Sequence, residues 1–327
     1  MPDQDVKVIA IIGRGRSGST ILDNVIGEMD GFFSAGQLHV LWKRMLMGFT
    51  CGCGVPVANC VLWSAVNAAA LQDPVRGRID PAQVVEWQDE VVRLRYARRL
   101  SNASDEHLNW PALDGYAGVL GRVYKSLSDH TGARVIVDSS KMPAIGALLR
   151  ALPDVSPYVV HLVRDPRAVA YSYKRLRTTV DREMKREGSA ENSFRYLYRN
   201  LAAQQVCRGY DDDRSMLLRY EDFVTHPAET LRRISHLVGE SPARLPVGGD
   251  GVVTLSPNHT AGGNPSRFKT GNVALRLDDE WVRRQRPLDR ATITAITLPL
   301  FRRYGYSVVS VRRSPSPDPE PGEAGAS

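Results

Sequence analysis

A glycine-rich segment lies between a short apolar run and an amphipathic stretch near the start of the chain. Residues 6–12 (VKVIAII) are apolar and β-branched enough for a buried parallel strand, and residues 17–29 place apolar side chains at helical spacing. The segment that joins them reads GRGRSGST, from Gly13 to Thr20. A strand–loop–helix unit of this kind exposes backbone N–H groups where the helix begins, and these groups bind anions such as phosphate.

The rest of the chain repeats the alternation of strand and helix patterns. Strand-like runs occur at residues 134–137, 158–163 and 216–219. Helical patterns follow at residues 144–152, 167–177 and 227–238. This order predicts an α/β fold, a three-layer sandwich around a central parallel sheet with right-handed crossovers. Residues 38–130 are mostly helical in pattern, with one long amphipathic helix expected at 84–100, and we expect them to form a helical insertion or cap over a substrate site.

Length and composition set further limits. The chain has 327 residues, 43% of them hydrophobic, which suits a single domain over residues 1–313. Residues 314–327 (SPSPDPEPGEAGAS) predict a disordered tail.

Charge and hydropathy exclude several classes of protein. A net charge of +7 suits an anionic small ligand, whereas the lack of a dense Lys/Arg run disfavours nucleic acid. No run approaches the roughly 18 apolar residues of a membrane span. The acidic start (MPDQD) does not resemble a signal peptide, so we expect a cytoplasmic protein with no membrane partner. The sequence does not indicate an oligomeric state.

Three interpretations of the glycine-rich segment compete. The spacing of Gly13, Gly15 and Gly18 fits a dinucleotide-binding loop, but residues 32–37 (FFSAGQ) lack the acid that would hold the ribose. A nucleoside triphosphate loop needs a lysine where Ser19 stands. The third interpretation keeps the shape of that phosphate loop and supplies the cation earlier, from Arg16.

The run from Arg16 to Thr20 (RSGST) resembles the 5′-phosphosulfate loop of sulfotransferases that use 3′-phosphoadenosine 5′-phosphosulfate (PAPS). A second motif strengthens the likeness. Residues 160–172 (VHLVRDPRAVAYS) resemble the family's 3′-phosphate motif, in which a strand ends at Arg164 and the following helix carries Ser172. A guanidinium at the carboxyl end of a strand can bind a phosphate through two hydrogen bonds.

Two later segments are also similar to the family. Residues 217–223 (LLRYEDF) would place Tyr220 near the adenosine, and residues 263–268 (GNPSRF) resemble a loop that covers the nucleotide. The resemblance therefore implies a P-loop-type fold and sulfuryl transfer from PAPS to a hydroxyl or amine of a small-molecule or carbohydrate acceptor, with no metal required. The cofactor-binding residues that it implies are Arg14, Gly15, Arg16, Ser17, Gly18, Ser19, Thr20, Arg164, Ser172, Tyr220, Asn264 and Arg267.

The catalytic candidates lie at the ends of two other segments. Arg16 would stabilise the charge on the leaving group. Lys141 follows a predicted strand in a segment (VDSSKMP) where relatives place a sulfate-contacting lysine or a base, so we expect it to contact the transferring group. Relatives carry Gly-Glu after the first helix, but this chain has Gly-Gln at residues 36–37, and an amide cannot accept a proton. His39 is then the first candidate for the base and Asp138 the second.

Two rival functions and one cysteine cluster remain open. A P-loop small-molecule kinase would need ATP and Mg²⁺, and a non-catalytic nucleotide-binding module would keep the phosphate loop without the chemistry. Cys51, Cys53 and Cys60 lie close together in the sequence, far from Cys207. We expect free or redox-active thiols, with no metal site assigned. The alternatives are a local disulfide, or structural zinc if Cys207 or a histidine supplies a fourth ligand.

Overall fold

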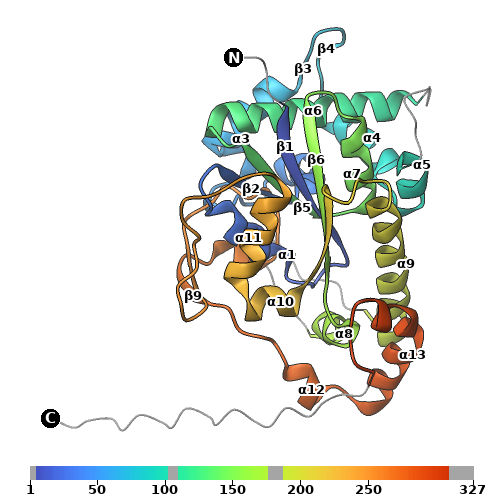
Figure 1. Ribbon diagram of the computed structural model, residues 1–327. Helices are drawn as coiled ribbons and strands as arrows, with labels where there is room; N and C mark the ends of the chain where they lie inside the picture. The colour runs from blue at the N-terminus through green and yellow to red at the C-terminus, as the bar shows by residue number, and fades with distance from the viewer. Residues whose placement is uncertain (1–4, 102–109, 176–186, 309–327) are drawn as a thin grey trace, which may run out of the picture.

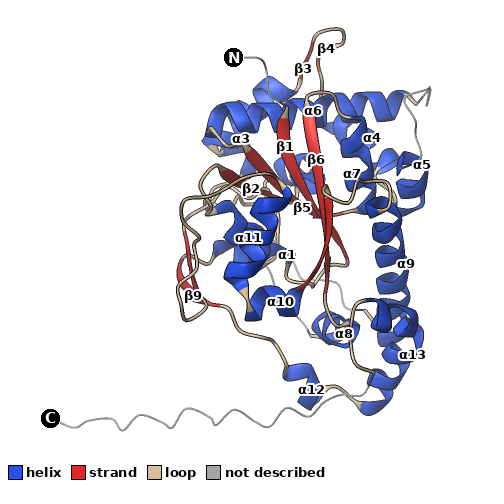
Figure 2. Ribbon diagram, viewed as in Figure 1, coloured by secondary structure: helices blue, strands red, loops and turns tan. Residues whose placement is uncertain are grey.

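A computed structural model of the protein describes residues 5–101, 110–175 and 187–308. The predicted tail at 314–327 lies outside these residues. The centre of the fold is a five-stranded sheet whose neighbouring strands all run parallel (Figures 1 and 2). Its strands, in spatial order, are β2 (Phe32–Gly36), β5 (Val135–Lys141), β1 (Val6–Gly13), β6 (Val155–Val163) and β7 (Ser215–Arg219).

Alternation along β1 divides the core into two layers. Val8, Ala10 and Ile12 face one apolar cluster, and Ile9 and Ile11 face the other, as the two-residue period of a strand requires. The second cluster is covered by α1 (Ser19–Gly27), α10 (Tyr220–Thr225) and α11 (Pro227–Leu237). The first is covered by α6 (Pro111–Thr131), α7 (Pro143–Leu148) and α9 (Ser189–Cys207). The predicted three-layer α/β fold is therefore confirmed.

The register of β1 brings three predicted segments to one edge of the sheet. Gly13 lies opposite Leu162 of β6, and Ile12 lies opposite Lys141 of β5. Because all three strands run parallel, their carboxyl ends meet at the same edge. The glycine-rich segment therefore lies between Lys141 on one side and the residues that follow β6, including Arg164, on the other.

The segment between β2 and β5 is mostly helical, as predicted, and its last helix, α6, packs against β1 and β5. Its elements are η1 (Leu38–Val40), α2 (Leu41–Leu46), η2 (Val57–Asn59), α3 (Val61–Ala70), the hairpin of β3 (Gln72–Asp73) and β4 (Gly77–Arg78), α4 (Pro81–Val91), η3 (Leu94–Tyr96), α5 (Ala97–Ser101) and α6.

The prediction of a single helix at residues 84–100 is wrong. Helix α4 ends at Val91, where the Arg93 side chain donates to the Asp89 carbonyl at 2.6 Å. The Arg93 backbone N–H turns to the carbonyl of Val91 at 2.8 Å. A guanidinium that satisfies one of the last helical carbonyls stabilises a helix end.

The C-terminal third adds a small hairpin and three helices to this core. Its elements are β8 (Val252–Leu255), η5 (Pro265–Phe268), β9 (Gly271–Ala274), α12 (Glu280–Arg284) and α13 (Pro287–Arg303). Helix α13 packs against α9 and α8 (Pro166–Lys174), while η4 (Leu149–Ala151) extends α7. Among the residues that the structure describes, no helix is both long enough and apolar enough to cross a membrane.

The chain between β8 and β9 returns to the edge of the sheet where the carboxyl ends of the strands meet. The backbone N–H of Ala261 donates to the carbonyl of Ala35 at 2.9 Å, and that of Gln37 donates to the carbonyl of Gly262 at 3.2 Å. These bonds join residues 261–262 to the end of β2. We call residues 256–268 the late loop; it lies beside the glycine-rich segment, as the next contacts show.

Candidate active site at the carboxyl edge of the sheet

The glycine-rich segment makes a tight turn before α1. Gly18 has φ +87° and precedes Ser19, the first residue of the helix. A Cβ atom at Gly18 would lie 2.3 Å from the ring of Tyr220, so no side chain fits there. The close approach leaves the backbone N–H groups at the start of α1 as potential donors to an anion.

Two other segments contact this turn. Arg16 donates to the side-chain oxygen of Asn264 at 3.3 Å, and Thr20 Oγ1 accepts from the backbone N–H of Asn264 at 3.2 Å. The carbonyl of Arg16 accepts from the guanidinium of Arg164 at 3.2 Å. The structure thus brings together Arg16, Thr20, Asn264 and Arg164, which were predicted from three separate motifs.

Tyr220 joins the two phosphate motifs. Its ring packs on Gly18, and the guanidinium of Arg164 lies 4.5 Å from the centre of the same ring. Arg164 also forms an ion pair with Asp278 at 3.3 Å. Ser172 is buried in α8, which begins two residues after Arg164. The start of that helix is fixed by Asp165, whose carboxylate accepts from the backbone N–H of Arg167 at 2.8 Å.

Cations outnumber anions around the glycine-rich segment. Arg14 is buried, pairs with Glu187 and lies with its guanidinium 4.4 Å from the centre of the Tyr173 ring. Burial and, to a smaller extent, the nearby charges of Arg199 and Arg16 lower the pKa of Lys141 to about 7, while the charge of Asp23 opposes the shift. Grouped, desolvated cations repel one another, so the arrangement favours an anionic ligand.

Lys141 is held in an uncommon backbone conformation. Its φ is +64°, and Arg16 has a similar φ of +68°. The Lys141 ammonium donates to the carbonyl of Ser139 at 3.3 Å, and its own carbonyl accepts from Arg199 at 3.5 Å. Left-handed backbone at residues other than glycine costs free energy and is concentrated at functional sites.

Asp23, which the sequence interpretation missed, is buried beside Lys141. The hydroxyl of Ser139 donates to its carboxylate at 2.8 Å. Burial, with a smaller contribution from the charge of Asp138, raises the pKa of Asp23 to about 7, although the hydrogen bond from Ser139 opposes the shift. Asp23 lies on α1, one turn after Thr20, among apolar neighbours that face the core. The sequence did contain a signal for Asp23, because its carboxylate interrupts a stripe of apolar side chains along the helix.

The two predicted bases differ in their surroundings. Asp138 is fully buried and accepts from the hydroxyl of Tyr124 at 2.9 Å and from the backbone N–H groups of Ser140 (2.8 Å) and Leu38. Burial raises its pKa, and these donors lower it. Burial, together with the charges of four surrounding cations of which Lys141 is the strongest, lowers the pKa of His39 to about 3. Among the described residues, His39 Nδ1 has no hydrogen-bond partner.

Arg267 lies deeper in the late loop than Asn264. Its buried guanidinium donates to the carbonyls of Thr260 at 3.1 Å and Thr50 at 2.6 Å. These bonds tie the late loop to the chain before Cys51. Its predicted contact with phosphate stays a prediction, while Asn264 is the residue of this loop that touches Arg16.

Three further residues of the site carried no motif in the sequence: Tyr173, Arg199 and Asp278. Tyr173 directly follows Ser172, the last residue of the 3′-phosphate motif. Arg199 and Asp278 come from α9 and from the chain after β9, and only the tertiary fold brings them to the strand ends.

The parallel sheet, the glycine-rich turn after β1 and the cations at the neighbouring strand ends are the features of a P-loop-type α/β fold. Residues 9–241 match the profile of the Sulfotransferase family. This match covers more than half of the chain, so the chain belongs to the Sulfotransferase family and sulfuryl transfer is its class of reaction.

Solved structures resemble the chain at low sequence identity. The sulfotransferase domain of the olefin synthase from Synechococcus PCC 7002 is 19% identical with a TM-score of 0.53, over 93% of this chain and 96% of that one. The sulfotransferase domain from the curacin biosynthetic pathway is 15% identical with a TM-score of 0.48, over 94% and 99% of the two chains. No curated protein sequence matches the chain.

Proposed function

We propose that the protein transfers the sulfuryl group of PAPS to a hydroxyl or amine of a small-molecule or carbohydrate acceptor. The observation that carries this proposal is the contact of Tyr220 with both Gly18 and Arg164. It joins an anion-binding turn to a second cation on the neighbouring strand. PAPS carries anionic groups on both sides of its ribose, a 5′-phosphosulfate and a 3′-phosphate, whereas the phosphates of ATP are all on the 5′ side.

Unused polar groups in the glycine-rich segment support a bound anion. The hydroxyl of Ser17 and Nε of Arg14 are buried, and neither has a hydrogen-bond partner among the described residues. Buried polar atoms without partners cost free energy, and a ligand that satisfies them recovers it. Phosphate and sulfate oxygens are acceptors that suit both groups.

In the proposed reaction the acceptor attacks sulfur in line with the bridging oxygen. A bond forms from the acceptor to sulfur, the bond from sulfur to the bridging oxygen breaks, and adenosine 3′,5′-bisphosphate (PAP) leaves. Negative charge grows on the bridging oxygen, where Arg16 and the backbone N–H groups of the turn would stabilise it. Lys141 would contact the sulfuryl oxygens. These cations would supply the charge that Mg²⁺ supplies in phosphoryl transfer from ATP, so we propose that catalysis needs no divalent metal.

We propose Asp23 as the group that takes the proton from the acceptor, ahead of His39 and Asp138. A base works best when its pKa lies near the working pH, and burial raises the pKa of Asp23 to about 7. The pKa of His39 is about 3, which makes the imidazole a weak base. The Asp138 carboxylate is occupied by donors from Tyr124, Ser140 and Leu38.

Calorimetry with PAP, 5′-AMP and ATP tests the donor, in buffer without added metal or chelator and again with Mg²⁺. We expect PAP to bind more tightly than 5′-AMP without Mg²⁺, and ATP to bind more weakly than PAP in both buffers. Equal affinity for PAP and 5′-AMP would refute a 3′-phosphate site. Tighter binding of ATP with Mg²⁺ would favour a kinase. Binding of PAP without turnover of PAPS across a panel of alcohols and amines would favour a non-catalytic module.

A further inference from the structure

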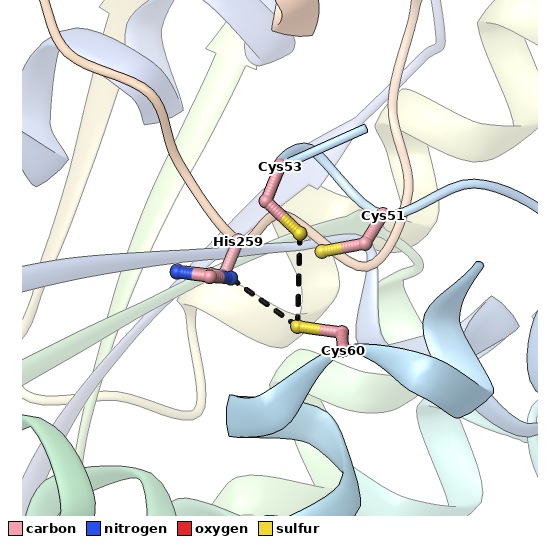
Figure 3. Close-up of side chains that lie close together, drawn as sticks. All are labelled: Cys51, Cys53, Cys60 and His259. Atoms are coloured by element: carbon pink, nitrogen blue, oxygen red, sulfur yellow. Dashed lines mark hydrogen bonds between the residues drawn. The ribbon is translucent and has the colours of Figure 1, made fainter. Parts of the chain in front are cut away.

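Three of the four cysteines converge on one histidine in the folded chain. Cys51, Cys53, Cys60 and His259 each offer one ligand atom, and these atoms all lie within 4.8 Å of one another (Figure 3). Cys60 Sγ is 3.2 Å from Nδ1 of His259 and 3.8 Å from Sγ of Cys53. Ligand atoms of a tetrahedral zinc ion, at about 2.3 Å for sulfur and 2.0–2.1 Å for nitrogen, lie about 3.5–3.8 Å apart. The spacing in the protein is therefore close to that of a four-ligand zinc site.

The local chain geometry points the cysteines inward. The backbone N–H of Gly54 donates to the carbonyl of Cys51 at 3.0 Å, and that of Cys51 donates to the carbonyl of Val55 at 2.7 Å, which folds residues 51–55 into a tight turn. Cys60 is the N-cap residue of α3.

The histidine is fixed to the cysteine loop by bonds that do not involve its ring. Trp63 of α3 donates to the carbonyl of His259 at 2.7 Å, and the backbone N–H of Gly52 donates to the carbonyl of Thr260 at 3.1 Å. A Cβ atom at Gly52 would lie 2.1 Å from the side-chain oxygen of Asn258, so glycine permits this approach. The four ligands are thus held together by the fold itself.

Burial argues for a closed site. Cys51 and Cys60 are fully buried, and Cys53 and His259 are partly buried. A disulfide would use two of the three cysteines and leave His259 and the third thiol facing the bond. A soft metal ion uses all four ligands, and tetrahedral sites of sulfur and nitrogen are typical of zinc. With four protein ligands, such a site has no open position for a substrate.

We propose that Cys51, Cys53, Cys60 and His259 bind one structural Zn²⁺ ion that ties the cysteine loop to the late loop. Binding releases the three thiol protons, so the site holds three thiolates and one neutral imidazole. This selects the zinc alternative left open by the sequence, with His259 rather than Cys207 as the fourth ligand. Asn264, which contacts Arg16, lies five residues after His259, so the ion braces the loop beside the glycine-rich segment.

Metal analysis of the full-length protein, purified without chelator, tests the proposal. We expect about one zinc per chain, lost in Cys53→Ser and in His259→Ala and kept in the control Cys207→Ser. Replacement of zinc by Co²⁺ should give the visible absorption bands of a tetrahedral thiolate site. Native alkylation should modify Cys51, Cys53 and Cys60 only after the metal is removed.

Two outcomes would overturn the proposal without touching the proposed reaction. One is wild-type protein with less than about a tenth of a zinc per chain that takes up neither zinc nor cobalt after reduction. The other is equal loss of zinc in Cys207→Ser and Cys53→Ser. A disulfide between two of the three cysteines, found by mass spectrometry without reductant, would also exclude the site. Because metal content and spectra need no sulfuryl donor, failure of the PAPS assignment would leave these results unchanged.

Discussion

The strand-end site and the cysteine–histidine cluster both join distant parts of the chain, but different forces hold their groups in place. At the strand ends, the register of β1 with β5 and β6 sets the positions of Lys141, Arg164 and the glycine-rich segment. In the cluster, two loops meet without a shared sheet. The sheet provides the first geometry, whereas hydrogen bonds between loops bring the four cluster ligands together and a bound metal would add to the stability of that arrangement. Changes at the strand ends should therefore alter binding and chemistry, and changes in the cluster should alter stability.

The largest expected effect is on stability, through Cys60→Ser. Loss of a structural zinc ligand should lower the free energy of unfolding by about 4 kcal/mol or more, a fraction of the roughly 10–16 kcal/mol of zinc binding in small zinc domains. Chemical denaturation of this variant and of Cys207→Ser measures the difference. An unchanged free energy of unfolding in Cys60→Ser, relative to the control, would contradict the structural role.

Arg16→Ala should affect turnover strongly and stability little, the reverse of what we expect for Cys60→Ser. We expect turnover at saturating PAPS to fall about 10²–10³-fold, the usual cost of removing one group that stabilises developing charge. The melting temperature should change little, because the sheet holds the turn. The matched control is Arg283→Ala, which removes an exposed arginine of α12. Full turnover in Arg16→Ala would refute its assignment to the leaving group.

Arg164→Ala separates the two phosphate sites. Loss of a charged hydrogen-bond donor should weaken PAP binding by about 1.5–3 kcal/mol, roughly 10–160-fold, and leave 5′-AMP binding almost unchanged. Calorimetry with both nucleotides measures the two affinities on the same protein sample. Equal weakening of the two ligands would mean that Arg164 supports the turn through the Arg16 carbonyl rather than contacting a 3′-phosphate.

The pH profile of kcat/KM should be bell-shaped with its maximum near pH 7. As pH falls below about 7, Asp23 gains a proton and cannot act as the base; as pH rises above about 7, Lys141 loses its charge. Each limb should approach a tenfold change per pH unit, and the apparent values belong to the pair because the two groups interact. Residual activity of Asp23→Asn should lack the acidic limb. An unchanged acidic limb in that variant would move the assignment to His39 or Asp138.

Asp278→Asn should have the smallest effect of these substitutions. Unlike Arg164→Ala, it should strengthen the binding of PAP. The Asp278 carboxylate is partly exposed and pairs with Arg164, so it competes with an anion for the same guanidinium. Exposed ion pairs contribute about 0.2–1 kcal/mol, which predicts PAP binding about 1.4- to 5-fold tighter in the variant. Weaker binding of PAP to Asp278→Asn would show that Asp278 orients Arg164 instead.

The fold and half of the site follow from local sequence patterns. Short apolar runs identified β1, β5, β6 and β7, and parallel strands with glycine turns place Arg164 and Lys141 at one edge. Asp23 was overlooked although its charge interrupts an apolar helical stripe. His259 had no signal, because 199 residues separate it from Cys60 and only the late loop, crossing the end of β2, brings it there. The amphipathic pattern continues past Val91, so periodicity gave no sign of the helix end, where the Arg93 guanidinium donates to the Asp89 carbonyl.

The left-handed backbone of Arg16 and Lys141 also affects which substitutions evolution can accept at these two positions. Glycine would relieve the strain at either residue, yet in the proposed mechanism it would remove a cation from the transferring group. Selection for stability alone would therefore favour glycine at these two positions, whereas selection for turnover would reject it. Libraries screened only for thermal resistance should accumulate glycine there and yield well-folded proteins that no longer turn over.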